Sequence, residues 1–170
     1  MSSLRFRDAA IEDLPVIVEI YNSTVSSRMV TADTDTVSVE SREEWFADHN
    51  PSRHPLWVVE TEAGETVGWV SFQPFYGRPA YDATAEISIY LKESARGKGL
   101  GKRILSYAMD FAPSIEINTL LGFIFSHNEP SLKLFLDLGF EKWGELPQIA
   151  ELDGVERSLT ILGKRIVSGF

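Results

Sequence analysis

Hydrophobic side chains alternate with polar ones, or recur at helical spacing, along most of the chain. Residues 4–7 alternate as in a short strand, and residues 11–25 carry apolar side chains at the spacing of an amphipathic helix. The polar segment 26–39 predicts a loop. Residues 41–49 predict a second short helix, with Ser41 as its N-terminal cap.

The rest of the chain interleaves strands with helices. The pattern predicts strands at 56–60, 66–72 and 85–91, a helix at 98–111, a strand at 120–125, a helix at 128–138, and a closing hairpin at 143–152 and 157–166. This order predicts an α/β fold in three layers, with a mixed sheet between helices. No repeat or linker interrupts it, so residues 1–170 are expected to form a single domain. Four tryptophans in the patterned segments are predicted core residues: Trp45, Trp57, Trp69 and Trp143.

Composition supports a globular protein of the cytoplasm. Hydrophobic residues make up 44% of the 170 residues, which is enough for a sizeable core. The absence of cysteine excludes disulfides, thiolate metal sites and a cysteine nucleophile, and it suits a reducing compartment. No N-terminal segment resembles a signal peptide, and no apolar run approaches the roughly 20 residues that cross a bilayer. We therefore expect a soluble cytoplasmic protein with no membrane partner.

The formal net charge of −9 argues against nucleic acid and anionic membranes as partners. It would also disfavour a polyanionic ligand unless positive charge were concentrated locally. Such a concentration occurs between positions 96 and 103, at Arg96, Lys98, Lys102 and Arg103. This segment is therefore the first candidate for an anion site.

The same segment contains a glycine-rich turn between a predicted strand and a predicted helix, Arg96-Gly97-Lys98-Gly99-Leu100-Gly101. Glycines let a backbone approach a ligand closely, and the start of a helix attracts phosphate. A Walker loop would need glycine at position 96 and Ser or Thr at 103, and the dinucleotide motif would need glycine at 102. Both motifs fail. A charged turn without a ligand remains the alternative reading of the spacing alone.

Several motifs together resemble the GNAT superfamily of N-acetyltransferases, and the order of elements follows that family throughout. The turn matches its acetyl-CoA signature, Arg-x-x-Gly-x-Gly. A closer resemblance, to the phosphinothricin and methionine-sulfoximine acetyltransferases, rests on residues 20–22, 86–90, 128–131 and 138–140. The resemblance implies a GNAT-type sheet with splayed central strands and helices on both faces.

The resemblance also assigns the cofactor site, with acetyl-CoA as co-substrate. It implies that the backbone of Ile89, Tyr90 and Leu91 pairs with the pantetheine arm, and that Asn128 hydrogen-bonds the cofactor. The residues that it implies for the pyrophosphate are Arg96, Gly97, Lys98, Gly99, Leu100, Gly101 and Lys102.

Acetyl transfer to an amine needs a base that deprotonates the amine and a donor that stabilises the oxyanion. Glu86 is the candidate base, because a carboxylate beside a sheet core tends to have a raised pKa. A solvent-facing edge charge is its alternative reading. Many relatives carry Tyr or His as the acid seven residues after the asparagine, where this chain has Phe135. The usual acid is therefore missing.

The segment before Glu86 offers candidate substrate contacts. Tyr76, Arg78 and Tyr81 form an aromatic loop in which the arginine suits a substrate carboxylate, with a surface salt bridge as the alternative. Tyr21 is read mainly as helix packing, and Arg28 as a second possible anion contact. No two histidines share metal-ligand spacing, so no metal is expected.

These observations predict an enzyme that moves the acetyl group of acetyl-CoA to the α-amine of a small amino acid or analogue. Methionine sulfoximine, methionine sulfone and phosphinothricin-like compounds are the acceptors that the resemblance implies. A polyamine or aminoglycoside acetyltransferase is the rival within the enzyme class, and an acyl-CoA sensor without turnover is the rival outside it. A homodimer is expected from the resemblance alone.

Overall fold

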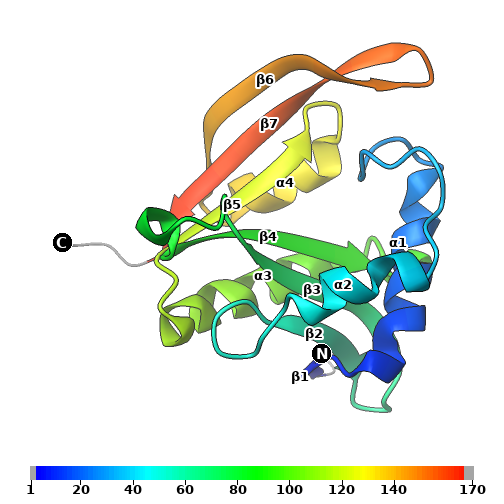
Figure 1. Cartoon of the computed structure of the whole chain (residues 1–170), viewed down its shortest axis with the longest axis vertical. Coiled ribbons are helices and arrows are strands. Elements are labelled where there is room, and N and C mark those ends of the chain that lie inside the picture. The colour runs from blue at the N-terminus through cyan, green and yellow to red at the C-terminus, as the bar shows by residue number, and fades with distance from the viewer. Residues whose placement is uncertain (1–2, 167–170) are drawn as a thin grey trace.

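The computed structural model describes residues 3–166 and confirms the three-layer α/β architecture (Figure 1). Seven strands form one mixed sheet in the order β1-β2-β3-β4-β5-β7-β6. The strands are β1 (Leu4–Asp8), β2 (Leu56–Thr61), β3 (Thr66–Pro74), β4 (Thr84–Leu91), β5 (Thr119–Phe125), β6 (Glu141–Leu152) and β7 (Val155–Arg165). The α-helices are α1 (Leu14–Val25), α2 (Glu43–Ala47), α3 (Leu100–Phe111) and α4 (Glu129–Asp137).

Neighbouring strands are antiparallel except at the centre, where β4 and β5 run parallel. The chain crosses between them through α3, as a parallel connection requires. The β6–β7 hairpin turns at Asp153 and Gly154, both with positive φ, as the Asp-Gly pair predicts.

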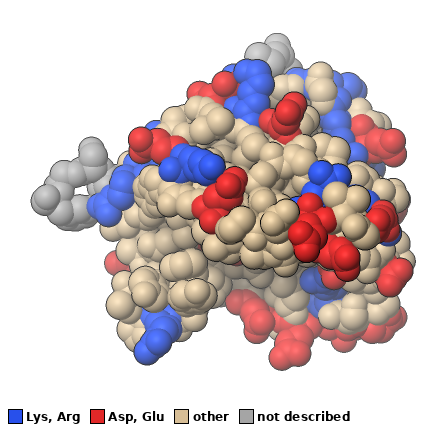
Figure 2. Space-filling view, turned by 90° about the horizontal axis from the view of Figure 1, so that it is seen from above, with Lys and Arg blue, Asp and Glu red and all other residues tan. Residues whose placement is uncertain are grey.

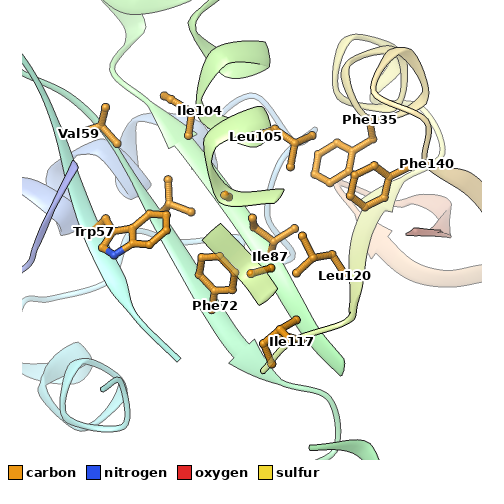
Figure 3. Packing of buried hydrophobic residues seen from close by; sticks show 14 of the residues in the cluster. Trp57, Val59, Phe72, Ile87, Ile104, Leu105, Ile117, Leu120, Phe135 and Phe140 are labelled. Atoms are coloured by element: carbon orange, nitrogen blue, oxygen red, sulfur yellow. The ribbon is translucent and has the colours of Figure 1, made fainter. Parts of the chain in front are cut away.

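The larger core lies between the sheet and helices α3 and α4. Alternate strand residues such as Val59, Phe72 and Ile87 point to this face and meet Ile104 and Leu105 of α3 (Figure 3). A smaller core on the other face packs Ile17 and Ile20 of α1 against Leu56, Val58 and Trp69. Burial on both faces explains why β2 and β3 are almost continuously apolar.

Three local predictions need correction. The first predicted helix begins with a 3₁₀ turn at Ile11–Asp13, and its α-helical part starts at Leu14. Ser41 does not cap the second helix: its hydroxyl donates to the Ser38 carbonyl, and a 3₁₀ turn at Glu40–Arg42 precedes α2. Trp143 is not a core residue, since it is 46% exposed, whereas Trp57 and Trp69 are buried.

Phe135 occupies the core and not a cavity. Its ring lies 4.9 Å from that of Phe140, at a near-perpendicular angle (Figure 3). Gly122 of β5 leaves room for it, because a Cβ at position 122 would come within 2.8 Å of the Phe135 ring. An apolar side chain fits this position on packing grounds.

None of the helices in residues 3–166 combines the length and the apolar character that crossing a bilayer requires.

Candidate active site

The site is built around a divergence of the two central strands. Strand β4 pairs with β3 along its length, from Ala85 to Leu91. Its pairing with β5 covers only Thr84 to Glu86 and then stops. Beyond Glu86 the two strands separate, as the resemblance implied (Figure 1). One backbone edge of β4 therefore has no strand partner within residues 3–166, and an extended ligand could pair with it.

A cavity of about 260 Å³ opens on the α1 side of β4. Its wall combines the inner face of α1, the segment that leads into α2, and the polar ends of β3 and β4. The lining residues are Ile17, Val18, Tyr21, Val37, Arg42, Trp45, Trp69, Ser71, Gln73, Glu86, Ser88 and Tyr90. Of the predicted site residues, the cavity brings together Glu86 and Tyr90.

Glu86 is half-buried at the point where β4 and β5 part, opposite Gln73 of β3. It makes no hydrogen bond within residues 3–166, and burial raises the pKa of its carboxyl group above the usual value. Glu86 also borders a second hollow, whose lining includes Asp48, His49 and His54. A desolvated, unpaired carboxylate beside a cavity has the properties of a general base.

His49 orients Ser71 on the cavity wall. The Nδ1–H of His49 donates to the Trp45 carbonyl at 2.9 Å, and its Nε2 lies 2.6 Å from the Ser71 hydroxyl. Burial lowers the pKa of His49, so the neutral imidazole accepts from Ser71. This role of His49 could not be predicted from the sequence, because the contact joins the segment after α2 to β3.

Tyr21 belongs to the cavity as well as to the packing of α1. Its hydroxyl donates to Asp33, and it also hydrogen-bonds Thr31. The guanidinium carbon of Arg42 lies 4.8 Å from the centre of the Tyr21 ring. Asn22 fixes the intervening loop by exchanging two 2.9 Å hydrogen bonds with the backbone of Val37.

The glycine-rich turn has the conformation that a phosphate site needs. Gly97 and Gly99 have φ of 74° and 76°, and a Cβ at either would meet no atom within 4 Å. Gly99 precedes the first residue of α3, and no side chain caps that helix end. The first amides of α3 therefore face an open, glycine-lined surface.

The charged residues of the turn have different surroundings. The guanidinium of Arg96 donates to the Leu91 carbonyl at 3.1 Å and to the Ser23 hydroxyl, which ties the turn to the end of β4. Lys98 is exposed. Lys102 lies 3.4 Å from Asp137 of α4.

Asn128 is buried and caps α4, as its position predicts. Its Oδ1 accepts from the Ser131 amide at 3.3 Å, and its Nδ2 donates to the Met29 carbonyl at 3.1 Å. These bonds hold the loop after α1 against the start of α4. His127 supports the same junction through a 2.8 Å contact with the Arg28 carbonyl.

The predicted substrate loop lies apart from the cavity lining. Tyr76 is 78% exposed and Tyr81 is 41% exposed, and Arg78 is exposed as well. None of the three is among the residues that line the cavity. Arg28, the second candidate for an anion contact, is engaged by Asp153 and by the Thr34 carbonyl.

No group of three or more metal-ligating side chains occurs within residues 3–166.

Comparison with known proteins gives the same picture. Residues 3–141 match the model of the acetyltransferase (GNAT) domain family. YwnH of Bacillus subtilis, provisionally named a phosphinothricin acetyltransferase, is 53% identical, over 96% of this chain and 99% of YwnH. The L-methionine sulfoximine/L-methionine sulfone acetyltransferase of Pseudomonas aeruginosa is 32% identical, over 94% of this chain and 93% of its own.

A solved structure extends the likeness to the backbone. The phosphinothricin acetyltransferase of Sinorhizobium meliloti, in complex with acetyl-CoA, superposes with a TM-score of 0.88 at 28% identity. The match covers 97% of this chain and 89% of that one. The diverging strands, the glycine turn and these matches define one class of protein. The chain belongs to the GNAT acetyltransferase family.

The raised pKa of Glu86 predicts a pH-dependent effect on stability. A protonated Glu86 favours the folded state below the ordinary pKa of a glutamate, and this contribution is lost as the pH rises through the higher folded-state pKa. E86Q cannot ionise, so at pH 8 it should exceed the native chain by a few degrees in Tm. The gain should vanish near pH 4.

Thermal unfolding across this pH range is the measurement. E62Q, at an exposed position between β2 and β3, is the control and should show no such gain. A pH-independent Tm difference for E86Q would contradict the assignment.

Proposed function

We propose that this protein transfers the acetyl group of acetyl-CoA to the α-amine of a small amino acid or analogue, by direct attack of the amine. The observation that carries the proposal is Glu86, a half-buried carboxylate with no hydrogen-bond partner among the described residues, at the point where β4 becomes free to pair with a ligand. The names of the relatives suggest methionine sulfoximine, methionine sulfone and phosphinothricin as acceptors.

We propose Glu86 as the catalytic residue and as a substrate contact. The ammonium form of an amine is not nucleophilic, and the carboxylate of Glu86 would take its proton. Acetyl-CoA supplies an activated acetyl thioester when bound. We propose that the proton then leaves through the second hollow that Glu86 borders, which His49 and His54 also line.

For the cofactor, we propose that the free edge of β4 at Ile89, Tyr90 and Leu91 pairs with the pantetheine arm. The amides at the start of α3 would hold the pyrophosphate, together with the charges of the turn. Asn128 would meet the cofactor with the hydrogen-bonding capacity that its two existing bonds leave unused. The residues proposed for the pyrophosphate are Arg96, Gly97, Lys98, Gly99, Leu100, Gly101 and Lys102.

Contacts of Tyr76, Arg78 and Tyr81 with substrate stay predictions. Because these side chains are exposed, they would contact a part of the substrate that extends beyond the cavity.

We also propose a cytoplasmic homodimer that binds neither nucleic acid nor membranes. The charge of −9 and the interspersed acidic and basic side chains of the face in Figure 2 support the absence of a polyanionic partner. Acetyl-CoA is a cytoplasmic metabolite, and the lack of cysteine suits a reducing compartment.

The β6–β7 hairpin supports a second copy of the chain as the partner. It extends from the body of the molecule (Figure 1) and exposes Trp143, Leu146, Ile149 and Val155, of which Ile149 is 57% exposed. Exposed apolar side chains in such number mark an interface. Light scattering should give a dimer mass for the native chain and a monomer mass for I149E. A native chain that is monomeric at micromolar concentration would contradict the dimer.

Thiol release from acetyl-CoA tests the reaction. The native chain should release thiol with methionine sulfoximine, methionine sulfone or phosphinothricin, and E86Q should lower kcat by roughly 10²–10⁴-fold, the usual contribution of a general base. Native kcat should rise with pH through the raised pKa of Glu86, because only the carboxylate accepts a proton. E62Q is the control.

Release only with spermidine or kanamycin would replace the proposed acceptor class. Tight binding of coenzyme A without release for any amine would instead indicate a sensor.

The glycine turn has a matched control within the chain. Gly99 and Gly64 both have positive φ, of 76° and 83°, and both face open space, but Gly64 lies in the β2–β3 hairpin. G99A and G64A should each lose about 1 kcal/mol of stability from the strained backbone. Only G99A should weaken coenzyme A binding, by roughly tenfold, the equivalent of one phosphate hydrogen bond. Equal affinities for the two variants by calorimetry would remove the turn from the cofactor site.

A further inference from the structure

The cavity beside Glu86 contains a second charged group that the sequence did not single out. Among the described residues that line it, Arg42 is the only cation and Glu86 the only carboxylate. Arg42 comes from the 3₁₀ turn before α2, and Glu86 comes from β4. Tyr90 lines the same cavity. Burial is the main cause that raises its pKa, while the charge of Arg42 lowers that pKa and the charge of Glu86 raises it.

Arg42 is held in place from two sides. Its Nη2 donates to Asp33 Oδ2 at 2.8 Å, and its guanidinium lies over the Tyr21 ring. Asp33 in turn accepts from the Tyr21 hydroxyl. The side chain is 28% exposed, so the pairing leaves part of it open to the cavity.

This arrangement leaves donors for a ligand. Within residues 3–166, Nε and Nη1 of Arg42 have no hydrogen-bond acceptor. A guanidinium is a rigid planar fork that matches a carboxylate, and it keeps its charge at any pH that the protein meets. The remaining walls, at Trp45, Trp69 and Tyr90, are aromatic and suit a small, weakly polar side chain.

We infer that Arg42 binds the α-carboxylate of the acceptor, and that the cavity selects zwitterionic α-amino acids by placing this cation opposite the base Glu86. The inference rests on the proposed function and adds a determinant of substrate class. An amino acid carries its amine and its carboxylate on one carbon, so the two can face opposite charges across a small cavity. A polyamine would instead bring a further positive charge towards Arg42.

Arg42 thereby takes the place that the sequence suggested for Arg78. Arg78 is exposed and does not line the cavity. R78A is therefore the competing variant, which tests whether the carboxylate contact belongs to the exposed loop instead.

The test compares two acceptors in each variant: methionine sulfone and its carboxamide, which keeps the amine and the side chain but lacks the negative charge. In the native chain, KM for methionine sulfone should be the lower. R42Q should raise KM for methionine sulfone roughly 10–100-fold, the worth of a charge-assisted pair, with kcat little changed. KM for the carboxamide should move by less than about threefold. The amine of the carboxamide is less basic than that of methionine sulfone, and this difference affects KM equally in every variant. It therefore cancels when the ratio of the two KM values is compared between variants.

Two further variants separate carboxylate binding from a merely structural role. D33N removes the charge of the partner, but an asparagine oxygen can still accept from Nη2 and the Tyr21 ring still lies against the guanidinium. It should therefore retain the preference for the carboxylate. R42K keeps the charge without the fork and should recover part of that preference. Calorimetric titration of methionine sulfone into the coenzyme A complex should give the same ranking without turnover.

The inference is overturned if R42Q weakens both acceptors equally, or if R78A removes the preference while R42Q keeps it. It is also overturned if the native chain acetylates only cationic amines. Absence of turnover with every amine would contradict the proposed function itself. The two failures can be told apart, because the R42Q comparison is made only with a native enzyme that turns over.

Discussion

The separation of β4 from β5 after Glu86 is the constraint on which the site depends. Each strand keeps its other neighbour: β3 pairs with β4 as far as Leu91, and β7 pairs with β5 as far as Phe125. The sheet therefore divides into two halves that are separately hydrogen-bonded. The separation leaves the facing edges of β4 beyond Glu86 and of β5 beyond Leu121 without a strand partner, and a ligand can satisfy the groups of β4 there. Glu86 lies where the separation begins, and Ser88 and Tyr90 of the same segment line the cavity.

Charge is distributed so that an acidic protein can bind an anionic cofactor and a zwitterionic acceptor at one place. Positive charge gathers at the glycine turn, while the helix end adds its own dipole. Arg42 is held by Asp33 and Tyr21, whereas Glu86 has no cationic partner within the described chain. An ion pair at Glu86 would lower its pKa and weaken it as a base.

Sequence periodicity predicted the elements well, because both faces of the sheet are buried and the pattern is strong. The glycine turn and Glu86 could be found because their neighbours in sequence are also their neighbours in space. The cavity wall and the residues that support it could not be found in this way, because they come together only through tertiary packing. These residues are Arg42, Asp33, Ser71 and His49. The prediction that Trp143 is a core residue was wrong for a related reason. The β6–β7 hairpin extends from the body of the sheet, so an apolar residue there stays exposed.

The most direct test of the central claim is hydrogen exchange of the β4 amides, with and without acetyl-CoA. Amides of β4 that face β5 beyond Glu86 have no strand partner and should exchange quickly in the free protein. Binding should protect them strongly, while the β2 and β3 amides, already paired, should change little. Tight binding of acetyl-CoA that leaves exchange across residues 87–91 unchanged would contradict the account, because the cofactor would then lie elsewhere.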